Sequence, residues 1–212
     1  MVAGPHLTER AQLCNLLAEK GPGAPTLCEG WTTHDLAIHL YVRERRPLAA
    51  LGILVPGPPA ALLKYTSERT RGALAYDRLV GRLRSGPPLA ARPFDRYFLH
   101  EYFVHHEDVR RAGGEGTFEL RSSGEMGGLE DGLWREMRFL SKVLARRVPV
   151  GLELHSAGRE RITAKRGSPA AVLEGRPSEI LLYLMGRGAV ARIVLEGPEE
   201  VVAAVHSTSF AI

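Results

Sequence analysis

Hydrophobic residues recur at helical spacing through the first two-thirds of the chain. Positions three and four residues apart predict helices that Gly, Pro or capping residues bound. Thr32 and Asp35 have the spacing of a capping box, which marks the start of the second helix. The predicted helices cover residues 7–20, residues 32 to about 47, residues 60–84, residues 94–112 and residues 129 to about 149. We therefore expect a helical bundle in this part of the chain.

The hydrophobic period changes after Pro149. Short apolar runs bounded by turn residues predict strands at residues 150–155, 161–165, 171–173 and 191–195. Helices are predicted at residues 178–185 and 198–205. Helices first and strands afterwards indicate an α+β protein. We predict a helical domain over residues 1–149 and a small α+β domain over residues 150–212.

The fourth predicted helix, residues 94–112, carries two ionisable groups on its apolar face. At 3.6 residues per turn that face comprises Phe94, Phe98, Glu101, His105, Val109 and Ala112. Burying a carboxylate and an imidazole costs several kcal/mol unless each finds a partner. A divalent metal is the most economical partner, because both groups are good zinc ligands. Glu101 and His105 are therefore candidate metal ligands.

A third ligand has to come from another helix, and His39 is the natural candidate. It lies among leucines on the inner face of the second helix. One carboxylate and two imidazoles match the three-ligand arrangement of catalytic zinc, which leaves a fourth position open. Two alternatives need no metal: a buried ion pair between Glu101 and His105, and a hydrogen-bonded core histidine at position 39.

Three neighbouring residues have weaker claims to a role. Asp108 lies near the edge of the apolar stripe and could orient a ligand imidazole. His106 points about 100° away from His105, so we expect it outside the ligand set. Cys28 precedes the second helix, and only that helix N-terminus could lower its pKa, so a packing role is favoured over a nucleophilic one.

Composition excludes several classes of function. Of 212 residues, 44% are hydrophobic and 25% charged, which is ordinary for a globular protein. The 28 basic and 24 acidic residues give a net charge of +4, but they are interleaved, so we predict no nucleic-acid partner. Apolar runs are too short to span a membrane, and the N-terminus lacks the pattern of a signal peptide. With two cysteines, a reduced cytoplasmic protein is expected.

Three segments resemble one known family. Residues 27–40 (LCEGWTTHDLAIHL) resemble the GW-T-x-x-D-L-x-x-H-L signature of the mycothiol-dependent maleylpyruvate isomerase family, which belongs to the DinB-like four-helix bundles. Residues 101–108 (EYFVHHED) resemble its second signature, Glu-x-x-x-His. Residues 174–187 (EGRPSEILLYLMGR) are similar to the sterol-carrier-like α/β domain attached to many of these bundles. The continuation VRERRP at residues 42–47 resembles a metal-binding subgroup of unassigned activity.

The resemblance implies a metal site and a thiol. It assigns His39, Glu101 and His105 as ligands of a divalent metal, usually zinc. It also implies mycothiol as co-substrate, a small electrophile as substrate and an arginine that holds an acidic group. Arg187 is the candidate for that arginine; the alternative is a cation stabilised at a helix C-terminus.

Three functions are compatible with the three ligands. The first is a thiol-dependent transferase or isomerase in which the metal activates the thiol. The second is a metal-dependent hydrolase in which the open position activates water. The third is a non-catalytic protein that binds metal or a small molecule. The sequence favours the first only through the family resemblance, since the ligands are the same in all three.

Overall fold

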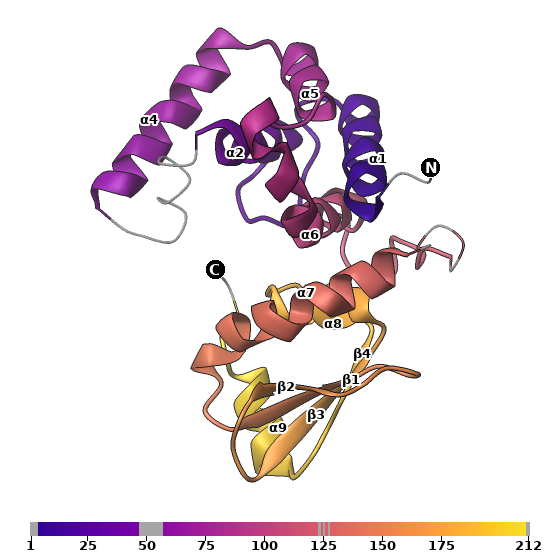
Figure 1. The fold of residues 1–212 in the computed structure, drawn as a ribbon. Coiled ribbons are helices and arrows are strands. Elements are labelled where there is room, and N and C mark those ends of the chain that lie inside the picture. Colours follow the sequence, from indigo (N-terminus) through magenta and orange to yellow (C-terminus); the bar gives the residue numbers. More distant parts are fainter. Residues whose placement is uncertain (1–3, 47–56, 123, 125, 127, 211–212) are drawn as a thin grey trace. The chain divides into compact units, whose positions relative to one another are not determined.

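The computed structural model describes residues 4–46, 57–122, 124, 126 and 128–210. The chain divides into two compact units, Met1–Phe118 and Glu119–Ile212 (Figure 1). The first is helical, and the second combines helices with a four-stranded sheet. This confirms the predicted α+β class. Among the described residues, no helix has the length and apolar character needed to cross a membrane.

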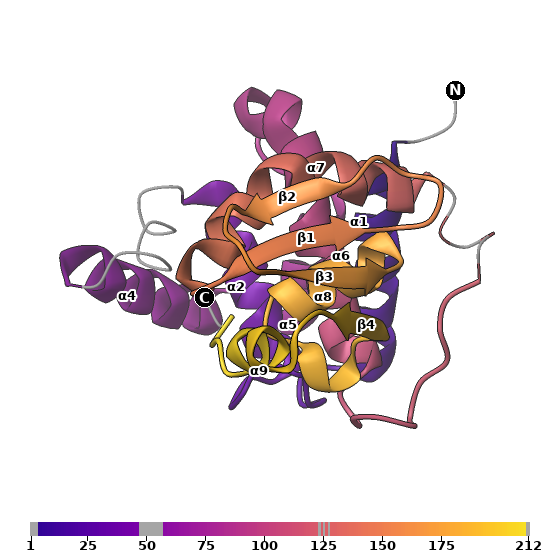
Figure 2. The same cartoon turned by 90° about the horizontal axis from the view of Figure 1, so that it is seen from below.

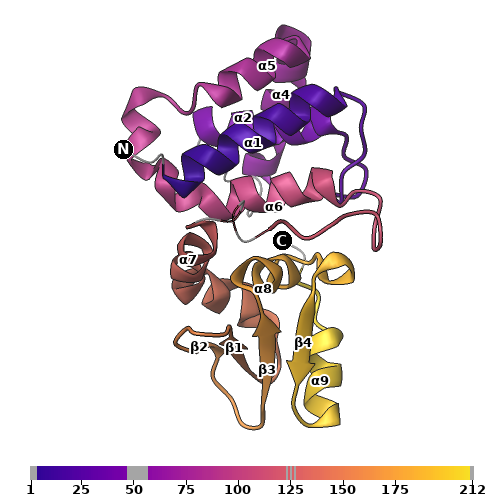
Figure 3. The ribbon, with the colours of Figure 1, turned by 90° about the vertical axis from the view of Figure 1, so that its right-hand side faces the viewer.

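The first unit is built around the pairing of its first and last α-helices. α1 lies along α6, with α2 and α5 completing the packing (Figure 3). Leucines from three helices form the centre of its core, among them Leu13, Leu36 and Leu79. The described helices are α1 (Pro5–Lys20), α2 (Thr33–Arg45), α4 (Pro58–Ala73), α5 (Tyr76–Arg84), the 3₁₀ helix η2 (Leu89–Phe98) and α6 (Leu99–Arg110).

Local signals set the ends of α1 and α2 as predicted. Gly21 ends α1 with φ of 73°, a value that glycine adopts without strain. Thr32 and Asp35 form both halves of the predicted capping box at the start of α2. Asp35 also pairs with Arg71 of α4. The predicted disturbance of this helix by Pro47 lies outside the described residues.

Two long helices predicted from periodicity are interrupted in the structure. The prediction of one helix over residues 60–84 is wrong, because Leu74 is extended (φ −124°, ψ 121°) and separates α4 from α5. The prediction of one α-helix over residues 94–112 is also wrong. Its first part belongs to η2, which contains Pro93, a residue without the N–H that an α-helix interior requires. Phe94 is consequently 61% exposed and is not part of a buried stripe.

The second unit is a sheet of order β2-β1-β3-β4 with helices packed on it (Figure 2). β1 pairs with β2 and β3 with β4 in antiparallel fashion, whereas β1 and β3 are parallel. Its principal elements are α7 (Leu129–Leu144), β1 (Gly151–His155), β2 (Ile162–Lys165), β3 (Ala170–Gly175), α8 (Pro177–Leu184), β4 (Ile193–Glu196) and α9 (Glu199–His206). All four predicted strands and both short predicted helices are present.

Helix α7 packs within the second unit. It contacts α8 and β2, and it buries Leu133 and Met137. Every residue of α8 is buried. The domain boundary predicted near Pro149 thus falls inside the second compact unit, after α7. Separate folding of residues 1–149 and 150–212 was predicted from the sequence, whereas the contacts of α7 favour a division before α7, and fragments of the chain can test which division holds.

We expect a fragment of residues 119–212 to unfold in one cooperative transition. A fragment of residues 150–212 should melt broadly and at lower temperature, because removing α7 uncovers apolar side chains on α8 and β2. Circular dichroism during thermal unfolding would compare the two fragments. Equal and equally cooperative melting would instead place the domain boundary at Pro149.

Candidate metal centre

Helix α6 presents Glu101 and His105 to the same point. The two residues are four positions apart, so their side chains lie on one face of the helix. The distance from Glu101 Oε2 to His105 Nε2 is 3.4 Å. Both side chains are nearly buried, with 16% and 9% of their surfaces exposed. Little water therefore competes for their lone pairs.

Helix α2 brings the third predicted residue to this pair. His39 Nε2 lies 3.9 Å from Glu101 Oε2, and the rings of His39 and His105 have centroids 5.1 Å apart. One donor atom from each of the three residues lies within 4.8 Å of the other two. The structure thus gathers His39, Glu101 and His105 into one cluster.

The donor set fits a zinc ion. Ligands at about 2.1 Å from a tetrahedral zinc lie roughly 3.4 Å from one another. The two separations that involve Glu101, 3.4 and 3.9 Å, lie close to that value, and the donor atoms of the two histidines lie within 4.8 Å of each other. Two imidazoles and one carboxylate are also the ligand types of open zinc sites. The His39, Glu101 and His105 side chains can therefore hold a divalent cation with only small shifts.

Burial and charge act differently on the three pKa values. Burial would raise the pKa of Glu101, but hydrogen bonds from His105 and His39 and the charge of Arg43 hold it well below its ordinary value. Burial lowers the pKa of His39, against the opposing effect of Glu101. Burial would also lower the pKa of His105, but hydrogen bonds with Asp108 and Cys28 raise it well above its ordinary value.

Asp108 contacts the far side of the His105 ring. Its fully buried carboxylate lies 2.9 Å from Nδ1 of His105 and accepts a hydrogen bond from it. Asp108 thus holds the Nδ1 proton, and Nε2 is the ring nitrogen that faces Glu101. Carboxylates that hold ligand histidines in this way are common in metal sites.

Cys28, for which the sequence favours a packing role, and Arg43, which the sequence did not single out, both lie beside the cluster. The Cys28 thiol donates to Asp108 Oδ2 at 3.2 Å, and Cys28, His105 and Asp108 form a second possible ligand group that shares His105 with the first. Arg43 Nη1 lies 3.0 Å from Glu101 Oε2. A signal for Arg43 exists in the sequence: it follows His39 by four residues, as His105 follows Glu101.

Two further residues are not members of the cluster. His106 is buried and bonds through Nδ1 to Glu9 of α1 at 2.7 Å, so it links two helices of the first unit. Arg187 follows α8 in the second unit, where its Nη1 donates to the carbonyl of Met185 at 2.5 Å. Its contact with substrate stays a prediction.

A helical unit with two histidines and one glutamate clustered in its interior has the features of a metal-binding helical bundle. Comparison with protein-family models gives no match, and neither does comparison with curated protein sequences. Solved structures with a similar fold include a mutant of mycothiol-dependent maleylpyruvate isomerase, with a TM-score of 0.58 and 18% identity over 92% of this chain and 93% of that one. Mycothiol-dependent maleylpyruvate isomerase itself gives a TM-score of 0.55 and 18% identity over 92% and 91%. At this identity the likeness is one of fold.

The two cysteines should differ in reactivity in the folded protein. Burial raises the pKa of Cys14 to about 11, so at pH 8 only about one in a thousand of its thiols is the reactive thiolate. Cys28 is half-buried, so a thiol reagent can reach it. We expect one thiol to react before unfolding and two after it. Because the pKa of Cys14 is raised, its reactivity should increase only as the pH approaches 11.

Single variants identify the thiol that reacts first. Cys28→Ser should remove the early reaction, and Cys14→Ser should keep it. Two thiols reacting at the same rate in the folded protein would contradict the buried position of Cys14.

Proposed function

We propose that this chain binds one divalent metal ion, best matched by zinc, through His39, Glu101 and His105. The observation that carries this proposal is the approach of the three donor atoms to within 4.8 Å of one another. The cluster joins two helices of the same unit, so the fold itself sets its geometry. Three protein ligands leave one position for a small molecule.

The surrounding residues prepare the three ligands for a cation. Asp108 holds the proton on Nδ1 of His105, so a metal ion would displace the proton of Nε2 and bind that nitrogen. Burial lowers the pKa of His39 and so favours the neutral ring that a metal needs. Glu101 is held in its ionised form, as its lowered pKa indicates. A cation that displaces the Nε2 proton of His105 would meet one carboxylate charge and two imidazole nitrogens.

We further propose a thiol-dependent transferase or isomerase, with mycothiol as co-substrate. The fold shared with mycothiol-dependent maleylpyruvate isomerase supports this choice over a hydrolase. A bound divalent cation would lower the pKa of a thiol in its open position, so that the thiolate forms at neutral pH.

In the proposed reaction the thiolate sulfur adds to an electron-poor carbon of the substrate. Conjugation keeps the new C–S bond and takes up a proton at the neighbouring carbon. Isomerisation breaks that bond again after rotation and releases the thiolate. Arg187 remains our proposed contact for an acidic group of the substrate, and the two free cysteines suit the reducing cytoplasm in which we place the reaction.

The purified protein should contain about one equivalent of zinc or another divalent metal per chain. His105→Ala should lose most of it, because two ligands rarely hold a zinc ion. Asp108→Asn keeps all three ligands and should weaken metal affinity by roughly 10–100-fold. Elemental analysis and a competition titration with a chelator would measure both effects.

His206→Ala is the matched control for this experiment. His206 is an exposed histidine at the end of α9, in the other unit. Its replacement should leave the metal content unchanged. Wild-type protein that neither contains metal nor takes it up would remove the proposed site.

Mycothiol should change the visible spectrum of the cobalt-substituted protein, because a thiolate ligand alters the absorption of the cobalt ion. S-methylated mycothiol, which has the same body but no free thiol, should leave the spectrum unchanged. Absence of any change at millimolar mycothiol, in protein shown to hold cobalt, would reject the thiol-dependent reaction while leaving the metal site intact.

A further inference from the structure

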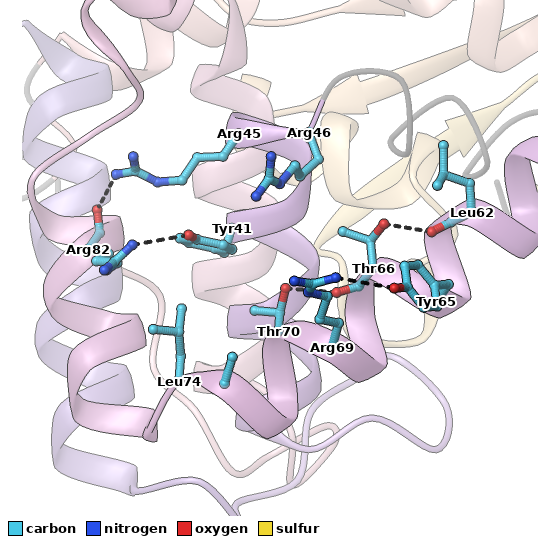
Figure 4. Close-up of a pocket in the computed structure, with 11 residues that line it drawn as sticks. Tyr41, Arg45, Arg46, Leu62, Tyr65, Thr66, Arg69, Thr70, Leu74 and Arg82 are labelled. Carbon is cyan, nitrogen blue, oxygen red and sulfur yellow. Dashed lines mark hydrogen bonds between the residues drawn. The ribbon is translucent and has the colours of Figure 1, made fainter.

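A pocket of about 740 Å³ lies in the first unit, lined by residues of α2, α4 and α5 and the chain next to them (Figure 4). Its volume falls within the range of roughly 300–1,000 Å³ typical of small-molecule sites. The pocket lining contains none of His39, Glu101 and His105. It is therefore a separate feature from the candidate metal centre.

The charge of the pocket lining is entirely positive in the described part of the chain. Four arginines line it, Arg45, Arg46, Arg69 and Arg82, and the described lining includes no carboxylate. Elsewhere in the same unit, buried and exposed arginines pair with acids: Arg10 with Asp95, Arg43 with Glu101, and Arg71 with Asp35. Four cations around one cavity repel each other unless an anion enters.

Two of these arginines contact neighbouring residues and still have further N–H groups that can donate hydrogen bonds. Arg45 Nη2 donates to the carbonyls of Arg82 at 3.0 Å and Gly86 at 2.7 Å, and its guanidinium lies 5.3 Å from the centroid of the Tyr41 ring. The Nε of Arg45 is buried and has no hydrogen-bond partner among the described residues. Arg82 Nη1 lies 3.4 Å from the Tyr41 hydroxyl. The remaining N–H groups of the Arg45 and Arg82 guanidiniums can donate to an anion in the pocket.

The other two arginines have no acidic partner among the described residues. Arg69 Nη1 donates to the Tyr65 hydroxyl at 3.2 Å, which is a neutral acceptor. Arg46 is exposed at the end of α2, and Figure 4 shows its side chain on the same side of the pocket as that of Arg45. Guanidinium groups bind carboxylates and phosphates through pairs of parallel hydrogen bonds.

The rest of the pocket lining is suited to contact the apolar part of a ligand. Leu62, Leu74 and the ring of Tyr65 contribute carbon surface beside the arginines. Leu62 is 43% exposed and Tyr65 58% exposed, so both can contact a ligand without rearrangement of the core. Flat organic molecules gain from stacking on such a ring.

We propose that this pocket binds a small organic anion that carries at least two negative groups on an apolar body. Carboxylate and phosphate groups share the chemistry that guanidinium ions recognise. The proposal goes beyond the metal-dependent reaction and does not depend on it, because the pocket uses different residues.

Titration calorimetry with terephthalate, a flat dicarboxylate, tests the proposal. The protein should bind terephthalate, and the neutral analogue terephthalamide should bind at least roughly 10-fold more weakly. Pyrophosphate, which has the charge without the apolar body, should also bind more weakly. 1,4-Phenylene bisphosphate, which carries two phosphates on the same ring, distinguishes the anionic group: whichever of it and terephthalate binds more tightly identifies the group preferred.

Variants locate the binding in the pocket. Arg46→Gln and Arg69→Gln should each weaken terephthalate binding by at least roughly 10-fold, since each removes a charge-assisted hydrogen bond. Arg78→Gln is the matched control, because Arg78 is an exposed arginine of α5 outside the pocket lining. Circular dichroism would check that all three variants are folded.

Three results would overturn this proposal. They are the absence of terephthalate binding, equal binding of terephthalamide, and an equal loss of affinity in Arg78→Gln. Addition of zinc should leave the affinity unchanged. An affinity that depends on zinc would contradict the independence of the two sites, whereas a failed metal site with intact anion binding would leave this proposal standing.

Discussion

The helical unit depends on how α6 pairs the polar side chains that it buries. Glu101 contacts His39 and Arg43 of α2. Tyr102 lies in a buried cluster with Asp95, Glu44 and Arg10, and His106 bonds to Glu9. Each of these groups would be costly to bury alone. Together they fix the rotation and position of α6 against α1 and α2, and so they fix the geometry of the candidate metal centre.

This pairing explains why the candidate centre could be predicted in part from the sequence. An ionisable pair at i and i+4 within a helical pattern is a local signal, as is the capping box that starts the helix of His39. The approach of His39 to Glu101 is a tertiary contact, and it was predicted from the inward position of each residue and from the family resemblance. The contact of Cys28 with Asp108 and that of Arg43 with Glu101 were missed because each joins segments far apart in the sequence.

The same limit applies to the fold, because contacts between distant segments leave no local pattern in the sequence. In the second unit, short apolar runs bounded by turn residues predicted the strands. Periodicity alone joined α4 to α5. Of these two helices, α5 contributes buried leucines to the core, whereas α4 packs the partly buried Leu63 against it. Periodicity also led to a predicted helix that begins within η2, before the actual start of α6. Pro93 lies in η2. The placement of α7 with the sheet depends on its contacts with α8 and β2, which no local pattern reveals.

The central claim is that a metal ion would be held by His39, Glu101 and His105. The competing group, Cys28, His105 and Asp108, shares one residue with it and differs in containing sulfur. The X-ray absorption spectrum of the zinc-loaded protein, recorded without added thiol, distinguishes them directly. Our account predicts a shell of nitrogen and oxygen at about 2.0–2.2 Å. A sulfur ligand at about 2.3 Å that disappears in Cys28→Ser would contradict it.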